Sequence, residues 1–74
     1  MTKEQFIFMT EIQKPLEFKY NNKVYSLNYD KNDKGESFIV FGQLYEGKKY
    51  NSAGELLNNA KIENHFFKDM LDIL

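Results

Sequence analysis

The sequence predicts one small α+β domain over residues 1–74: an N-terminal helix, a three-stranded antiparallel meander and two C-terminal helices. Two observations lead to this prediction. Apolar residues alternate on both sides of Asn21-Asn22, and they recur at helical spacing near both ends of the chain. No linker long enough to divide the chain interrupts this order, so a single domain is expected.

The composition favours a dense aromatic core. Phenylalanine and tyrosine make up 16% of the 74 residues, and there is no cysteine. A domain of this size buries only about 60% of the surface that its unfolded chain exposes. Without disulfides or thiolate metal sites, stability is expected to come from the aromatic rings, from a partner, or from both.

The composition of the chain argues against nucleic acid and membranes as partners. All ten basic residues are lysine, against eleven acidic ones, for a net charge of −1. Arginine, whose planar fork binds phosphates and guanine, is absent. No run approaches the ~20 apolar residues of a membrane span, and the first residues lack a signal-peptide pattern, so we expect a cytoplasmic protein.

The first helix is expected over residues 3–13. Thr2 and Gln5 have the spacing of a capping box, and Pro15 disfavours helical backbone at the residue before it. The residues at helical spacing that should face the core are Phe8, Met9 and Ile12, with Phe6 close to them.

A β-hairpin around Asn21-Asn22 is the strongest local signal. Asparagine tolerates the positive φ that a two-residue turn demands. Such a turn pairs Tyr20 with Lys23 and continues that register along both strands. One face then carries the apolar side chains, which are Leu16, Phe18, Tyr20, Tyr25, Leu27 and Tyr29.

After a solvated loop over residues 30–35, residues 37–41 predict a third strand that is apolar on both faces. The last strand of a meander lies at a sheet edge, where one face is normally wet, so something is expected to cover its second face. The following segment stays ambiguous: Leu44 and Tyr45 are candidates to extend the sheet, residues 46–48 resemble a turn, and Lys49-Tyr50 is a candidate short fourth strand.

Two helices are expected at the C-terminal end. Ser52 and Glu55 have capping-box spacing before a short helix over residues 53–60. Asn64 is the expected cap of the last helix. Its predicted apolar stripe consists of Phe66, Met70, Ile73 and Leu74, with Phe67 and Leu71 alongside.

No catalytic constellation stands out. His65 is the only histidine, and without cysteine it cannot form a zinc site unless carboxylates supply the other ligands. The acidic residues are scattered, and no pair is placed by local spacing for acid–base work. The chain is therefore expected not to be an enzyme and to hold no metal or cofactor.

Two segments resemble small uncharacterised proteins of low-GC bacteria and their mobile elements. Residues 17–27 (EFKYNNKVYSL) are similar to an opening hairpin that often reads E-F-x-Y-N-G-K-x-Y-x-I, and residues 49–57 with 60–62 are similar to the second half. The chain departs from them at Asn22, where those proteins favour glycine, and at Gly54. The resemblance implies a turn and a capped helix, but no activity, ligand or site.

The leading functional hypothesis is a non-catalytic protein-interaction module that binds another protein or forms a homodimer. Its expected contact surface is the two-faced third strand, namely Phe38, Ile39, Val40 and Phe41. One alternative is single-stranded nucleic-acid binding through tyrosines of the hairpin, although these rings fit the core better. Another is a small phage or plasmid regulator of a host protein.

Overall fold

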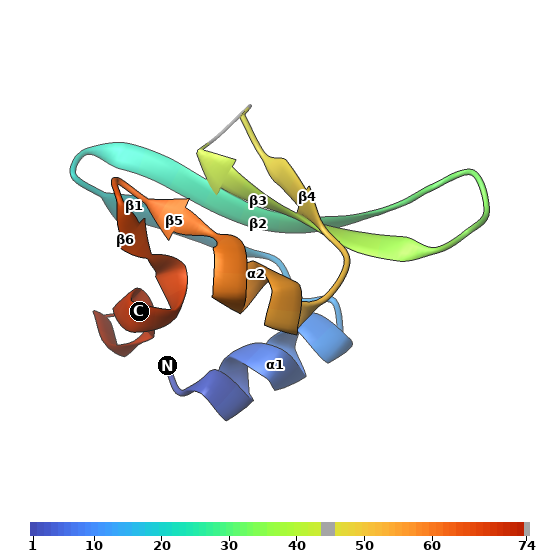
Figure 1. Ribbon diagram of the computed structural model, residues 1–74, viewed down its shortest axis with the longest axis horizontal. Helices are drawn as coiled ribbons and strands as arrows, with labels where there is room; N and C mark the ends of the chain where they lie inside the picture. Colours follow the sequence, from blue (N-terminus) through green and yellow to red (C-terminus); the bar gives the residue numbers. More distant parts are fainter. Residues whose placement is uncertain (44–45, 74) are drawn as a thin grey trace.

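The computed structural model describes residues 1–43 and 46–73, and it has the α+β architecture that the sequence predicts. An antiparallel sheet forms one layer, and the helices lie together on one of its faces (Figure 1). The elements are α1 (Lys3–Glu11), β1 (Leu16–Tyr20), β2 (Lys23–Lys31), β3 (Ser37–Gln43), β4 (Lys48–Tyr50), α2 (Ala53–Asn59), β5 (Lys61–Ile62), β6 (His65–Phe66) and the 3₁₀ helix η1 (Phe67–Ile73).

The β1–β2 hairpin has the predicted register. Tyr20 pairs with Lys23, Phe18 with Tyr25 and Leu16 with Leu27. The two turn residues, Asn21 and Asn22, have φ values of 49° and 64°. Asparagine adopts this left-handed conformation more readily than most residues, which is why the turn could be recognised from the sequence.

The third strand lies inside the sheet and not at its edge. The strand order is β1-β2-β3-β4, and Ile39 of β3 pairs with Tyr50 of β4. The expected edge position was therefore wrong, while the short fourth strand is confirmed. Leu44 and Tyr45, the candidates to extend the sheet, lie outside the described residues.

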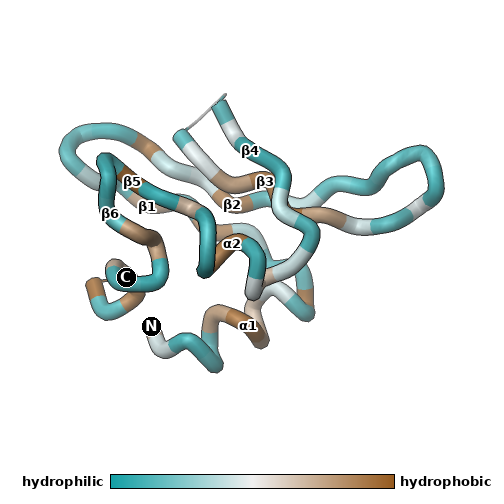
Figure 2. Tube along the Cα trace, viewed as in Figure 1, coloured by the Kyte–Doolittle hydropathy of each residue, from teal (hydrophilic) through white to brown (hydrophobic). Residues whose placement is uncertain are grey.

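The loop between β2 and β3 is shorter than predicted, because β2 continues to Lys31, which pairs with Ser37. Asn32 then organises the turn. Its side-chain oxygen accepts hydrogen bonds from the backbone N–H groups of Lys34 and Glu36 at 2.9 and 3.0 Å. Figure 2 shows this hairpin end as a hydrophilic stretch that projects beyond the helices.

Aromatic rings from four parts of the chain meet in the core. The Phe67 ring lies 4.6 Å from Phe41, 5.4 Å from Phe6 and 6.1 Å from Phe18, between ring centroids. Phe18 also stacks on Tyr25 at 5.7 Å. Such pairs contribute about 0.5–1.5 kcal/mol each beyond their area burial. The predicted aromatic core is confirmed.

Helix α1 begins as predicted and ends earlier. Thr2 and Gln5 form both hydrogen bonds of the capping box. At the other end Gln13 has φ 54°, its N–H donates to the Thr10 carbonyl at 3.1 Å, and the Lys14 N–H donates to the Met9 carbonyl at 3.0 Å. This Schellman motif stops the helix at Glu11, two residues before the predicted end.

The buried face of α1 is rotated from the predicted one. Phe6 and Met9 are buried, whereas Phe8 and Ile12 are 61% and 55% exposed. The helix contacts α2, and Phe6 and Met9 share one core cluster with side chains of the sheet. Ile7, the residue that the pattern placed on the outer side, is half-buried against this cluster.

Helix α2 follows the prediction closely, with the Ser52 hydroxyl accepting a hydrogen bond from the Glu55 N–H at 3.1 Å. The predicted last helix is present, but it begins only at Phe67 and its predicted cap is wrong. Glu63 and Asn64, with φ values of 50° and 71°, form a tight turn between β5 and β6, so Asn64 does not cap a helix.

A 3₁₀ helix follows in place of the expected α-helix, and its spacing moves the apolar stripe. The buried residues are Phe67, Met70 and Leu71. Phe66 is half-buried, Ile73 is 68% exposed, and Leu74 lies outside the described residues.

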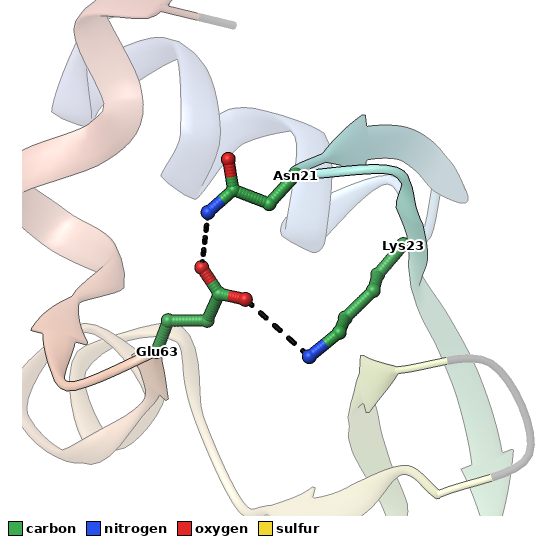
Figure 3. Close-up of polar contacts among 3 residues, drawn as sticks. All are labelled: Asn21, Lys23 and Glu63. Atoms are coloured by element: carbon green, nitrogen blue, oxygen red, sulfur yellow. Dashed lines mark hydrogen bonds and ion pairs between the residues drawn. The ribbon is translucent and has the colours of Figure 1, made fainter.

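The two tight turns contact each other (Figure 3). The Glu63 carboxylate accepts a hydrogen bond from the Asn21 side-chain amide and lies 3.4 Å from the Lys23 ammonium nitrogen. A second link joins the ends of the chain, where the Met1 amino group donates to the Leu71 carbonyl at 3.0 Å. The C-terminal segment is thereby held to both the hairpin and α1.

Candidate functional site

Within residues 1–43 and 46–73, no three histidine, aspartate or glutamate side chains gather where they could hold a metal ion. His65 is exposed and sits in the short strand β6. None of the helices in this part of the chain combines the length and apolar character of a membrane span.

The tyrosines of the hairpin face the core. Tyr25 is buried, while Tyr20 and Tyr29 are half-buried against it. The Tyr29 hydroxyl donates a hydrogen bond of 2.9 Å to the Lys14 carbonyl, and burial raises the pKa of this phenol. These rings are therefore part of the core or packed against it.

The predicted contact surface on β3 divides between the two sides of the sheet. Ile39 and Phe41 are buried in the core, at 6% and 2% exposure, so they cannot serve as a surface. Phe38 and Val40 lie on the face without helices and are half-buried. The predicted surface thus narrows to these two residues.

Other residues of the same chain partly cover even the side chains of Phe38 and Val40. The Lys49 ammonium nitrogen lies 4.9 Å from the Phe38 ring centroid. A methyl group added at Gly47 would lie 2.5 Å from Val40 Cγ1, so the backbone at Gly47 packs tightly on that side chain. Gly47 and Lys49 therefore cover part of the second face of β3.

Outside the C-terminal segment, the large apolar side chains that are exposed in the described part of the chain are Phe8 of α1 and its C-cap residue Ile12. Phe8 and Ile12 stand one turn apart on its outer side, and both are more than half exposed. They line an open groove of about 510 Å³ between α1 and the start of β1. The apolar residues of this groove are Met1, Phe8, Met9, Ile12, Pro15 and Leu16.

The outer edge of β1 adjoins this groove through Leu16. Among the described residues no strand pairs with this edge. Because a two-residue turn makes Tyr20 and Lys23 a hydrogen-bonded pair, Phe18 and Leu16 also bond to β2. The N–H and C=O groups of Glu17 and Lys19 then point outward, and both side chains are exposed.

We call these two adjoining features the α1–β1 surface: Phe8, Ile12, Pro15 and Leu16, together with the outer edge formed by Glu17 and Lys19. It offers apolar area beside unpaired backbone donors and acceptors, the combination used when a protein adds a strand to a sheet edge. The two charged side chains on so short an edge limit indiscriminate pairing.

The sequence does not predict this surface, for two reasons. Helical spacing places Phe8 and Ile12 in the core, because it identifies an apolar stripe but not the direction in which the helix packs. The hairpin pattern concerns only the side of β1 that pairs with β2. The free edge could have been inferred from the predicted meander, in which the first strand has a neighbour on one side only.

Comparison with known protein families, with curated proteins and with solved structures finds no match to this chain. The functional inference therefore depends on the geometry of the α1–β1 surface.

Proposed function

We propose that this protein is a non-catalytic interaction module that binds a protein partner, either another protein or a second copy of itself, through the α1–β1 surface. The observation that carries the proposal is the exposure of Phe8 and Ile12, at 61% and 55%, beside an unpaired strand edge. An exposed apolar cluster next to polar groups is typical of protein contact sites. Fully burying a phenylalanine or isoleucine contributes about 1.5–3 kcal/mol, so covering the exposed parts of both contributes roughly 2–4 kcal/mol.

The fold leaves most of these two side chains uncovered, because the residues that α1 contributes to the core are Phe6 and Met9. The Schellman motif at Gln13 holds the end of the helix in place. A rigid platform of this kind loses little conformational entropy when a partner binds.

A capture experiment with matched variants tests the proposal. Wild-type protein, the double variant Phe8→Ser with Ile12→Ser, and the control Ile73→Ser are immobilised and incubated with lysate of the producing cells. Ile73 is 68% exposed and lies outside the groove. We expect proteins retained by the wild type and by Ile73→Ser to be lost from the double variant.

Capture that is the same for all three proteins would contradict the proposal. A fourth variant, Phe38→Ser, examines the other face of the sheet. Loss of capture in that variant alone would show that the binding surface lies on β3, where the sequence predicts it.

A further inference from the structure

Building on this proposed function, we infer that the partner of the α1–β1 surface is a second copy of the chain, joined by antiparallel pairing of the two β1 edges. This pairing extends the four-stranded sheets of two molecules into one continuous sheet. It is symmetric, so each copy contributes the same edge, which is the commonest way in which identical chains associate.

The backbone restricts how two β1 strands can meet. Only Glu17 and Lys19 direct their N–H and C=O groups outward, so these residues must occupy hydrogen-bonded positions in the new pair. With the two-fold axis at Phe18, Glu17 lies opposite Lys19 of the second copy, and Lys19 opposite its Glu17. Two such pairs make four inter-chain hydrogen bonds.

Charge selects this register among those that the backbone allows. An axis at Glu17 would place two carboxylates opposite each other, and an axis at Lys19 would do the same with two ammonium groups. The axis at Phe18 sets opposite charges together twice. Opposite charges directly across strands are favourable and like charges are unfavourable.

The same register also fits the core side of the sheet. Phe18 meets Phe18 of the second copy, and Leu16 meets Tyr20 of the second copy. All three side chains are half-buried in the isolated chain and pack against its core. Aromatic and aliphatic pairs of this kind stabilise neighbouring strands. The edge is only five residues long, so the dimer is expected to be weak.

Sedimentation velocity over about 10 µM to about 1 mM, at low salt, tests the inference. We expect wild-type protein to shift from monomer to dimer within this range. Glu17→Lys alone and Lys19→Glu alone each place like charges opposite each other twice. Each variant should weaken the dimer about thirtyfold, which corresponds to ~2 kcal/mol.

Two arms then distinguish this pairing from a general effect of charge. The double variant Glu17→Lys with Lys19→Glu restores opposite charges across the axis, so it should dimerise like the wild type. An equimolar mixture of the two single variants should form a heterodimer, because each supplies the charge that the other lacks. Both side chains are exposed, so circular dichroism should show unchanged folding in every variant.

A wild type that remains monomeric throughout, or a dimer that ignores these substitutions, would overturn the inference. In that case capture that still depends on Phe8 and Ile12 would leave the proposed function standing, with a different protein as partner. The reverse outcome is a dimer that depends on the charges at Glu17 and Lys19, together with capture that does not change when Phe8 and Ile12 are substituted. That outcome would support the edge pairing and refute the role of the α1 groove.

Discussion

Adjacent phenylalanines at the end of β6 are expected to differ sharply in their contribution to stability. Phe67 has no exposed surface and touches three other phenylalanine rings. Phe66 is half-buried, and the ammonium nitrogens of Lys61 and Lys68 lie 4.8 and 5.3 Å from its ring centroid. Truncation of each to alanine compares the same side chain in two environments.

The magnitudes follow from these contacts. Removing a fully buried phenylalanine costs about 3–5 kcal/mol. A 74-residue domain has about 4–11 kcal/mol of unfolding free energy in total, so Phe67→Ala should be close to unfolding. Phe66→Ala removes partial burial and two exposed cation–π contacts, which together amount to about 1–2 kcal/mol. Phe67→Leu, which keeps most of the volume, should cost about 1–2 kcal/mol.

Urea unfolding followed by circular dichroism measures these differences. If Phe67→Ala does not fold, Phe67→Leu supplies the value for that site, and Phe66→Leu is its matched control with an expected cost below ~1 kcal/mol. A larger cost at Phe66 than at Phe67 would refute the reasoning. It would mean that the last segment follows the α-helical stripe that the sequence suggests.

Three further predictions concern single contacts. Tyr29→Phe should cost about 1 kcal/mol in urea unfolding, because it removes the hydrogen bond to the Lys14 carbonyl. Burial raises the pKa of this phenol in the folded state. Its contribution to folding stability is therefore present below the ordinary tyrosine pKa of about 10 and is lost as pH rises through the folded pKa. Alkaline unfolding monitored by tyrosinate absorbance should be less steep in the variant, and an unchanged profile would contradict this. Gly47→Ala should destabilise the fold by about 1–3 kcal/mol, because the added methyl group would lie 2.5 Å from Val40 Cγ1. Adding Val40→Ala should recover part of that loss in thermal melts. Strictly additive effects of the two substitutions on stability would count against the contact. Asn22→Ala should cost about 1–2 kcal/mol because φ is 64° there, whereas Asn22→Gly should retain stability, and equal melting temperatures for the two would exclude backbone strain as the cause.

Local rules predicted the elements whose signals are self-contained. The hairpin register depends on Asn21-Asn22 and on alternation within a few residues, and the sheet has that register. The capping box of Thr2 and Gln5 is likewise local, and it forms as expected. Both features are specified by neighbouring residues, so tertiary packing had little to add.

The wrong predictions have tertiary causes. Phe8 and Ile12 are exposed because α1 turns Phe6 and Met9 toward the core cluster and also contacts α2. Helical spacing alone does not record these tertiary contacts. The last helix begins later than predicted because Glu63, a residue that rarely adopts positive φ, does so in a turn with Asn64. Glu63 is held there by contacts with the β1–β2 turn, about forty positions earlier in the chain, which no local pattern records.

The position of the contact surface can be measured directly by following backbone amide and side-chain resonances in a concentration series. The structure predicts that the amides of Glu17 and Lys19 shift and become protected from exchange as dimer forms, together with the resonances of Phe8 and Ile12. Shifts confined to Phe38 and its neighbours on the open face of the sheet would contradict the α1–β1 surface as the place where this protein binds its partner.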